Sequence, residues 1–213
     1  GTARRLLSMN IGILGGTFDP FHYGHIEPVL AVREEMEWDR ILYVLAKRQP
    51  FKSADGAAPL WHRWAMLILG TADHDVIRAT DVELARGDVS YTVDTLELIR
   101  RDYPDATLDW IIGDDNLAAL GAWRNLPRIF ELANFVVLTR GNYELPADLQ
   151  PRVTTANERS THGNIVFAHN ATVPVSSTAI RNRVRAGEPI DAFVDPRVSR
   201  YIHHNRLYSE ALT

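Results

Sequence analysis

The chain has 213 residues, of which 46% are hydrophobic and 23% charged, with a formal net charge of −4 and no cysteine. The lack of cysteine excludes disulfides, thiolate metal sites and a cysteine nucleophile, and the net charge excludes a global basic field for a nucleic acid polymer. No apolar run reaches the ~20 residues that cross a bilayer, so we expect no membrane association and a cytoplasmic protein. The length suits one domain, which we expect over residues 1–213, with residues 1–9 as a flexible N-terminal extension.

Strand and helix patterns alternate along the chain, which predicts an α/β, Rossmann-like three-layer fold with a mainly parallel sheet and helices on both faces. Apolar runs predict strands at 11–14, 41–45, 76–79, 108–112, 135–138 and 165–168. Helical spacing predicts helices at 25–37, 60–69, 92–103, 122–133 and 177–186, and a last helical region at 191–204 that breaks or begins afresh at Pro196. Residues 47–59 and 141–163 are predicted to be long loops.

The first predicted strand leads into the sequence GGTFDPFHYGH at residues 15–25. Gly15 and Gly16 allow a ligand to approach the backbone, and the free N–H groups of a helix start favour an anion. His22 and His25 flank Gly24, and their rings can donate hydrogen bonds to phosphate oxygens. These residues predict a phosphate site at the carboxyl end of the first strand.

Simpler interpretations of the same turn remain open. A histidine at a helix start can cap the backbone or lie in the core, and two histidines at this spacing without a third ligand do not make a zinc site. Asp19 and Pro20 favour a structural turn, in which Asp19 caps the following residues.

Residues 175–181, VSSTAIR, form a second candidate anion site at the start of a predicted helix. Ser176 or Ser177 suits the N-cap position, and the helix dipole favours an anion by ~0.3–1 kcal/mol. Arg181, one turn into the helix, can form paired hydrogen bonds with phosphate oxygens. An ordinary capped amphipathic helix with surface arginines is the alternative.

Residues 111–115, IIGDD, end a predicted strand at a glycine followed by two carboxylates. A carboxylate at this place can accept hydrogen bonds from the vicinal hydroxyls of a ribose. The alternative, which is compatible with ribose binding, is that Asp114 caps the next helix.

The HYGH sequence behind GGTFDP resembles the HxGH nucleotidyltransferase superfamily, and the later SSTAIR sequence resembles its SSTxIR motif. The resemblance implies transfer of a nucleotide from a triphosphate to an acceptor phosphate, for which positioning and electrostatic stabilisation dominate. It implies catalytic roles for His22, His25 and Arg181. It also implies that ATP is bound by Gly15, Gly16, Thr17, Gly113, Asp115, Ser177 and Thr178, with Asp115 near the ribose.

Two further features narrow the acceptor. SYTVDTL at residues 90–96 resembles a stretch of the bacterial nicotinate mononucleotide adenylyltransferases, and Trp123 matches a tryptophan of that family. The resemblance, which runs from Ile11 to about Tyr208, implies that the indole of Trp123 stacks on the pyridine ring. It implies that the nicotinate nucleotide also meets Phe18, Thr92 and Arg140, the first two through nearby main-chain groups. A packing role for Trp123 is the alternative.

The sequence departs from that family in two loops. Phe51 stands where a PPHK-like loop has histidine, although Lys52 remains. Residues 139–143 lack the proline of an RPGY-like run, which puts the loop geometry around Arg140 in doubt.

The resulting hypothesis is an enzyme that adenylylates nicotinate mononucleotide with ATP, giving deamido-NAD and pyrophosphate. Mg²⁺ bridging the phosphates is the implied cofactor, without a full set of protein ligands, and the enzyme is expected to be a monomer or homo-oligomer. Pantetheine-phosphate adenylyltransferase explains the phosphate motifs but gives no reason for Thr92 and Trp123. A non-catalytic nucleotide-binding regulator is the alternative from another class, and a tRNA synthetase is disfavoured by the short chain.

Overall fold

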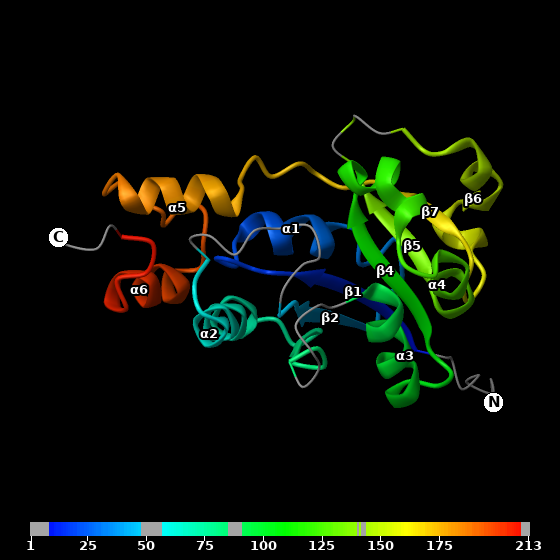
Figure 1. Cartoon of the computed structure of the whole chain (residues 1–213), viewed down its shortest axis with the longest axis horizontal. Helices are drawn as coiled ribbons and strands as arrows, with labels where there is room; N and C mark the ends of the chain where they lie inside the picture. The colour runs from blue at the N-terminus through cyan, green and yellow to red at the C-terminus, as the bar shows by residue number, and fades with distance from the viewer. Residues whose placement is uncertain (1–8, 48–56, 85–90, 140, 142–143, 210–213) are drawn as a thin grey trace, which may run out of the picture. The chain divides into compact units, whose positions relative to one another are not determined.

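The structure is a computed structural model that describes residues 9–47, 57–84, 91–139, 141 and 144–209. Within these residues, seven strands form one sheet in the order β3-β2-β1-β4-β5-β7-β6 (Figure 1). The strands are β1 (Asn10–Gly16), β2 (Arg40–Leu45), β3 (Ile77–Thr80), β4 (Thr107–Gly113), β5 (Asn134–Leu138), β6 (Val153–Thr154) and β7 (Ile165–Ala168).

Helices separate most of these strands along the chain (Figure 1). The α-helices are α1 (Tyr23–Ala31), α2 (Leu60–Thr71), α3 (Thr92–Asp102), α4 (Leu126–Leu132), α5 (Ser177–Arg185) and α6 (Pro196–His204). Three short 3₁₀ helices are also described, namely η1 (Asp114–Ala122), η2 (Ala147–Arg152) and η3 (Ala156–Glu158).

The described strand pairs are parallel, and β1 is paired with β4 from Asn10 opposite Thr107 to Leu14 opposite Ile111. The chain passes from β1 outward to β3 and then returns to β4 on the other side of β1, so the strand order reverses there. Right-handed crossovers put the connections of such a sheet on both of its faces. The Rossmann-like α/β fold predicted from the alternating pattern is therefore confirmed.

The chain divides into two compact units. The first contains residues 1–14, 32–42 and 91–170, and the second contains residues 15–31, 43–90 and 171–213. That the whole chain acts as one domain stays a prediction.

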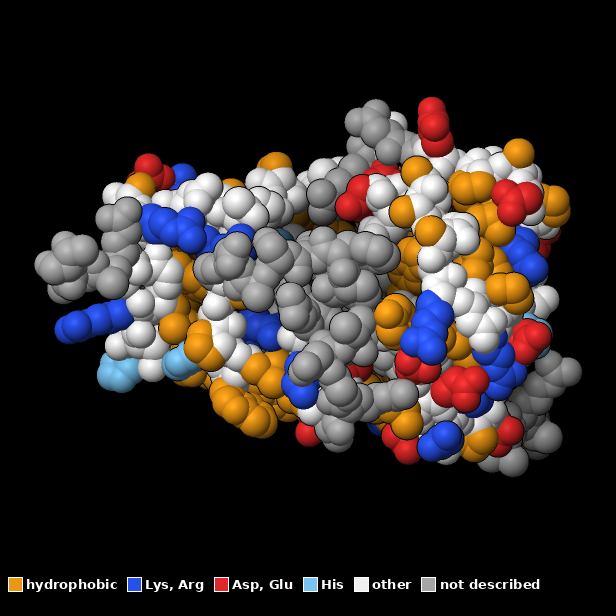
Figure 2. Space-filling view, in the orientation of Figure 1, with side chains coloured by type: hydrophobic (Ala, Val, Ile, Leu, Met, Phe, Trp, Pro, Cys, Tyr) orange, Lys and Arg blue, Asp and Glu red, His pale blue; other side chains and the backbone are white. Residues whose placement is uncertain are grey.

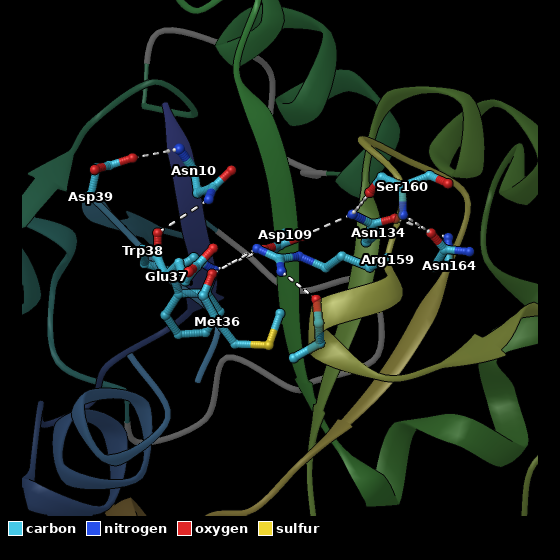
Figure 3. Close-up of polar contacts among 11 residues, drawn as sticks. Asn10, Met36, Glu37, Trp38, Asp39, Asp109, Asn134, Arg159, Ser160 and Asn164 are labelled. Atoms are coloured by element: carbon cyan, nitrogen blue, oxygen red, sulfur yellow. Dashed lines mark hydrogen bonds and ion pairs between the residues drawn. The ribbon is translucent and has the colours of Figure 1, made fainter. Parts of the chain in front are cut away.

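The first unit is built on β4, β5 and β7, and it contains a buried polar network (Figure 3). Asp109 of β4 is fully buried and accepts hydrogen bonds from Trp38 Nε1 at 2.8 Å and from Asn134 Nδ2 at 2.9 Å. Arg159 Nη2 lies 3.3 Å from Asp109 Oδ2 and also donates to the carbonyl of Met36 at 2.6 Å. Because a lone buried charge is costly, these mutual contacts are what allow the carboxylate and the guanidinium to be buried.

In the second unit, α2, α5 and α6 bury one apolar cluster. Its buried members are Ala58, Met66, Ile180, Ile190, Val194, Val198, Ile202 and Leu207. Helix α6 begins at Pro196, as predicted, because Asp195 caps it by accepting a hydrogen bond from the Arg197 N–H at 2.8 Å.

The helix predicted at residues 25–37 begins earlier and ends sooner, since α1 stops at Ala31. Val32 and Met36 continue the helical spacing and are both buried, which is why the pattern indicated a longer helix. Residues 32–37 instead form turns, and Glu37 has a φ of +52°, in the left-handed region that a right-handed helix cannot continue through.

The helix predicted at residues 122–133 is also shorter, because 3₁₀ helix η1 ends at Ala122 and α4 begins only at Leu126. Asn125, with a φ of +52°, separates the two, and Pro127 lies in the first turn of α4. Proline is common in the first turn of a helix, so Pro127 is a sequence signal for a helix that begins near this residue.

The predicted loop at residues 141–163 is only partly irregular, since it contains η2, β6 and η3. A strand of two residues is too short for an alternating pattern to show. Of the other predicted loop, at residues 47–59, residues 48–56 lie outside the described part of the chain. Among the described helices, none is both long and apolar enough to span a membrane.

Candidate functional site

Gly15 and Gly16 are the last residues of β1, and Thr17 begins the turn that follows; all three are partly exposed. The carbonyl of Gly16 accepts a hydrogen bond from the Ala46 N–H at 2.8 Å, which holds the turn beside the end of β2. A Cβ on Gly16 would lie 2.8 Å from the Phe18 ring, so the close backbone approach predicted for this position requires glycine.

The side chain of Phe18 is buried, with only 1% of its surface exposed, and its φ is +48°. Its ring packs edge-on against His25, with centroids 5.1 Å apart, and against Phe21, with centroids 5.6 Å apart. A substrate can therefore meet this residue only through its main chain, as the family resemblance implies. The role of Phe18 in nucleotide binding stays a prediction.

The two histidines of the HYGH sequence form one stacked pair. Their ring centroids are 3.6 Å apart at 24°, and Phe21 stacks against His25 from 5.5 Å at 21°. His25 Nδ1 accepts a hydrogen bond from the His22 N–H at 3.2 Å, and this bond requires a lone pair on Nδ1. The ring proton of the neutral His25 side chain is then on Nε2, which makes Nε2 a hydrogen-bond donor.

The backbone of His25 is fixed by Tyr43, whose hydroxyl donates to the His25 carbonyl at 2.9 Å. Tyr43 is fully buried, and burial raises the pKa of its hydroxyl far above the ordinary value. The hydroxyl therefore stays protonated and remains a donor.

Gly24 brings the two sequence motifs together within the second unit. A Cβ at Gly24 would lie 2.8 Å from Val175 Cγ1 and 3.0 Å from the ring of His22. The start of α1 thus lies directly against the segment that leads into α5, at a distance that only glycine permits.

Helix α5 begins at Ser177, and its N-cap is Ser176, one of the two predicted cap residues, whose side chain accepts a hydrogen bond from the Ala179 N–H at 3.2 Å. Ile180 is fully buried and Val184 packs against the same cluster, so one face of the helix is anchored. The helix predicted at residues 177–186 is confirmed, and it ends one residue earlier, at Arg185.

The polar side chains of α5 reach back to the turn after β1. Ser177 Oγ donates to the carbonyl of Pro20 at 3.1 Å, and Arg181 Nη1 donates to the carbonyl of Asp19 at 2.7 Å. Arg181 Nη2 also donates to Thr178 Oγ1 at 3.2 Å. The SSTAIR and GGTFDPFHYGH sequences, which are far apart along the chain, are therefore joined by hydrogen bonds.

Basic side chains gather on α5 and α6 despite the net negative charge of the chain, although Arg183 and Arg197 are paired with nearby carboxylates. Helices α5 and α6 contain arginines and histidines but no acidic residue, and blue and pale-blue side chains are visible in this region of Figure 2. An anion can thus be attracted locally.

Asp19 does more than the structural turn that the sequence predicts for it. The residue is buried, and its Oδ1 accepts hydrogen bonds from the Ala58 N–H at 3.1 Å and from the Tyr208 hydroxyl at 2.5 Å. The carboxylate therefore joins distant parts of the chain, and its capping of the next residues stays a prediction. Sequence reasoning missed Tyr208, because no local pattern links residues so far apart.

Arg63 was also missed. Its guanidinium is buried and donates to four carbonyls, those of Thr17 at 2.9 Å, Ala46 at 2.8 Å, Lys47 at 3.0 Å and Ala58 at 3.2 Å. One side chain thus connects the turn after β1 with the end of β2. The sequence does contain a signal for burial of this side chain, since Arg63 shares the helical spacing of the inward residues Met66 and Leu67.

In the first unit, β4 ends at Gly113, and the two predicted carboxylates follow in η1. Asp114 is buried, and its Oδ2 accepts a hydrogen bond from the Gly141 N–H at 3.1 Å. Asp115 is exposed, and its Oδ1 accepts from Asn116 Nδ2 at 3.2 Å. Of the two carboxylates, Asp115 is the one that solvent reaches, as a ribose-binding group requires.

Thr92 and Trp123, the two predicted nicotinate-binding residues in the described part of the first unit, lie on adjoining segments. The guanidinium of Arg124 lies 4.6 Å from the ring centroid of Tyr91, so the residue after Trp123 contacts the residue before Thr92. Both predicted residues are partly exposed, and the indole of Trp123 meets Phe135 edge-on with centroids 5.7 Å apart.

Three further predictions concern Arg140, Phe51 and Lys52, and these residues lie outside the described part of the chain. In the part that is described, no three histidine or carboxylate side chains gather in a way that would hold a metal ion.

Comparisons with known proteins agree with these motifs. A family model described as cytidylyltransferase-like matches residues 13–183. A protein of Syntrophotalea carbinolica named "Probable nicotinate-nucleotide adenylyltransferase" is 37% identical over 212 residues, covering 94% of this chain and 97% of that protein. A protein of the same name from a Roseiflexus species is 39% identical over 203 residues, covering 94% and 98%.

Among solved structures, a similar fold occurs in the nicotinic acid mononucleotide adenylyltransferase of Plasmodium falciparum, complexed with NaAD. The TM-score is 0.71 at 21% identity, and the match covers 96% of this chain and all of that one. The fold of this chain is therefore that of a known enzyme structure.

Proposed function

The chain belongs to the nicotinate-nucleotide adenylyltransferases of the cytidylyltransferase-like family, and from this we propose that it transfers the adenylyl group of ATP to nicotinate mononucleotide. The products are deamido-NAD and pyrophosphate, as part of NAD biosynthesis. The structural observation that carries the proposal is the stacked His22–His25 pair, joined through the turn after β1 to Arg181.

The proposed reaction is a direct displacement. A phosphate oxygen of the mononucleotide attacks the α-phosphorus of ATP, a new P–O bond forms, and the bond from that phosphorus to the bridging oxygen of pyrophosphate breaks. No covalent bond to the protein forms. In such a transfer the protein contributes mainly orientation and stabilisation of developing charge.

We assign one set of residues to the phosphates. His25 offers Nε2–H as a donor on a ring that Phe21, His22 and the Tyr43 hydroxyl hold in place. We assign His22 and His25 to the triphosphate and Arg181 to the leaving pyrophosphate. The backbone at Gly15, Gly16 and Thr17 and the start of α5 at Ser177 and Thr178 complete the ATP-binding set.

We assign a further set of residues to the nucleoside and the acceptor. Exposed Asp115, following Gly113, is proposed to accept hydrogen bonds from the ATP ribose. The indole of Trp123 is proposed to stack on the pyridine ring, and main-chain groups near Thr92 to bind the nicotinate carboxylate. Arg140 and the main chain of Phe18 are proposed to meet the same nucleotide.

A divalent metal ion is consistent with this family, and we propose that Mg²⁺ enters as the MgATP complex. Mg²⁺ commonly binds substrate phosphates and water with few protein ligands, which fits a site whose described residues offer hydrogen-bond donors more than carboxylates. When bound, the ion neutralises phosphate charge. We further propose action in the cytoplasm on small molecules, as a monomer or homo-oligomer.

The proposal is tested by incubating the full chain with MgATP and nicotinate mononucleotide and identifying the products by mass spectrometry. Deamido-NAD and pyrophosphate are expected in equal amounts. Removing one transition-state stabiliser costs on the order of 10²–10³ in rate, so His25→Ala should lose most of the activity while melting normally.

His62→Ala is the matched control, since this histidine is hydrogen-bonded to Tyr201 at 2.9 Å and has no part in the proposed site. It should keep full activity. Hydrolysis of ATP without formation of a dinucleotide would contradict the proposed function.

A further inference from the structure

Asp19 contacts several charged and polar groups, and it has no assigned part in the proposed reaction. Its side chain is 7% exposed, and its Oδ2 lies 3.9 Å from Arg181 Nη1. The same guanidinium nitrogen donates to the Asp19 carbonyl at 2.7 Å. One residue therefore contacts Arg181 through both its main chain and its side chain.

The other oxygen of Asp19 is held by Tyr208, which comes from the segment after α6. The Tyr208 hydroxyl is 2.5 Å from Asp19 Oδ1, a short distance for a hydroxyl that donates to a carboxylate. Burial, and next the charge of Asp19, raise the pKa of Tyr208 far above its ordinary value. The hydroxyl thus keeps its proton and donates it to this bond.

The backbone after α6 is shaped to deliver that hydroxyl. Arg206 has a φ of +53°, and the Leu207 N–H donates to the carbonyl of Ile202 at 3.0 Å, so the helix ends with a left-handed residue. Tyr208 itself has a φ of +61°, which is rare for a bulky residue and points to a constraint that outweighs its cost. Its ring packs against the apolar cluster under α5.

We propose that Tyr208 and Asp19 are positioning residues for Arg181. The Tyr208 hydroxyl fixes the Asp19 carboxylate, and Asp19 holds the Arg181 guanidinium in the orientation that meets the leaving pyrophosphate. This inference rests on the proposed function, which assigns Arg181 to the pyrophosphate. It implies that the segment after α6 helps to position a phosphate-binding residue.

A packing role for Tyr208 would be served equally by phenylalanine, so Tyr208→Phe separates the two explanations. The variant keeps the ring in the apolar cluster and removes only the hydroxyl. A hydrogen bond to a charged group is strong enough to change a rate about tenfold. We expect kcat to fall about tenfold, with the KM for nicotinate mononucleotide and the melting temperature unchanged.

Tyr201→Phe is the matched control. It removes a tyrosine hydroxyl from the same apolar cluster, one that bonds His62 at 2.9 Å instead of Asp19. Its kcat should equal that of the wild type.

A double-mutant cycle tests whether the effect passes through Arg181. In an Arg181→Lys background, Tyr208→Phe should have less than about a twofold further effect, because the group that it positions is already gone. A full tenfold effect in both backgrounds would overturn the proposal, as would an unchanged kcat in Tyr208→Phe itself.

Asp19→Asn provides a second variant should Tyr208→Phe fail to fold. The amide oxygen can still accept from the Ala58 N–H and the Tyr208 hydroxyl, while the negative charge facing Arg181 is removed. The same loss of kcat is expected, and normal kcat would contradict the positioning role.

Pyrophosphate binding by calorimetry keeps this inference distinct from the proposed function. If the wild type formed no dinucleotide, the proposed function would fail, yet its affinity for pyrophosphate could still be compared with that of Tyr208→Phe. About tenfold weaker binding by the variant supports positioning of Arg181, and equal affinity overturns it.

Discussion

Replacing Gly24 with alanine sets two opposite effects against each other. Alanine in a helix is favoured over glycine by about 1 kcal/mol, and Gly24 lies in the first turn of α1. The added Cβ, however, would lie 2.8 Å from Val175 Cγ1 and 3.0 Å from the His22 ring, whereas ordinary contact begins at 3.4 Å. The His22 ring would therefore have to move by about 0.4 Å, which is 3.4 Å less 3.0 Å.

The cost of this steric clash should exceed the gain in helix propensity. Overpacking a tight contact costs about 1–3 kcal/mol, so the free energy of unfolding should fall by about 1 kcal/mol after the gain in helix propensity. The rate should fall further than the stability, because displacement of a catalytic group by a fraction of an ångström can cost about 10–100-fold. The two quantities are measured by urea unfolding and by pyrophosphate release.

Gly121→Ala is the control, since a Cβ there meets nothing within 4 Å. It should leave the rate unchanged and the stability equal or slightly higher. If Gly24→Ala behaved in the same way, the close contact between α1, His22 and the segment before α5 would be refuted as a requirement for activity.

Three further predictions concern other parts of the chain. Asp109→Ala leaves a buried guanidinium without its carboxylate, so urea unfolding should show a loss of about 3–5 kcal/mol, and a loss below 1 kcal/mol would contradict the network in Figure 3. Trp123→Ala should raise the KM for nicotinate mononucleotide about 10–100-fold, since stacking on a base is worth about 1–3 kcal/mol, and an equal rise in the KM for ATP would argue against stacking. Hydrogen bonds from Arg197 lower the pKa of Asp195 in the folded protein. The ionised Asp195 cap therefore stabilises the fold fully above the unfolded pKa of an aspartate, about 3.9, and this stabilisation is lost as the pH falls through the lower pKa of the folded state. Asp195→Ala should thus cost about 1 kcal/mol at pH 7 and much less at pH 3, and an equal cost at both would refute the linkage.

The parts that sequence predicts well are those encoded by neighbouring residues. The strand, turn and helix start at residues 11–25 lie close together in the sequence, so the glycines and the histidine pair could be recognised before the structure. Ser176 likewise caps α5 as its residue type favours.

The parts that sequence missed depend on contacts between distant residues. The hydrogen bond from Tyr208 to Asp19 joins positions 189 residues apart, and no local sequence pattern predicts it. Arg63 is intermediate, because its spacing shows its place on the inward face of α2, but no pattern shows the four carbonyls that it binds. Helix ends also escaped prediction where a left-handed residue, such as Glu37, interrupts an apolar pattern that continues beyond it.

The choice of acceptor is the central claim, and it is tested most directly by comparing kcat/KM for three acceptors with MgATP. The acceptors are nicotinate mononucleotide, nicotinamide mononucleotide and phosphopantetheine, and pyrophosphate release is the common readout. We expect turnover only with the pyridine nucleotides and the highest value with the nicotinate form. Preferred turnover of phosphopantetheine, or turnover of none of the three, would contradict the assignment.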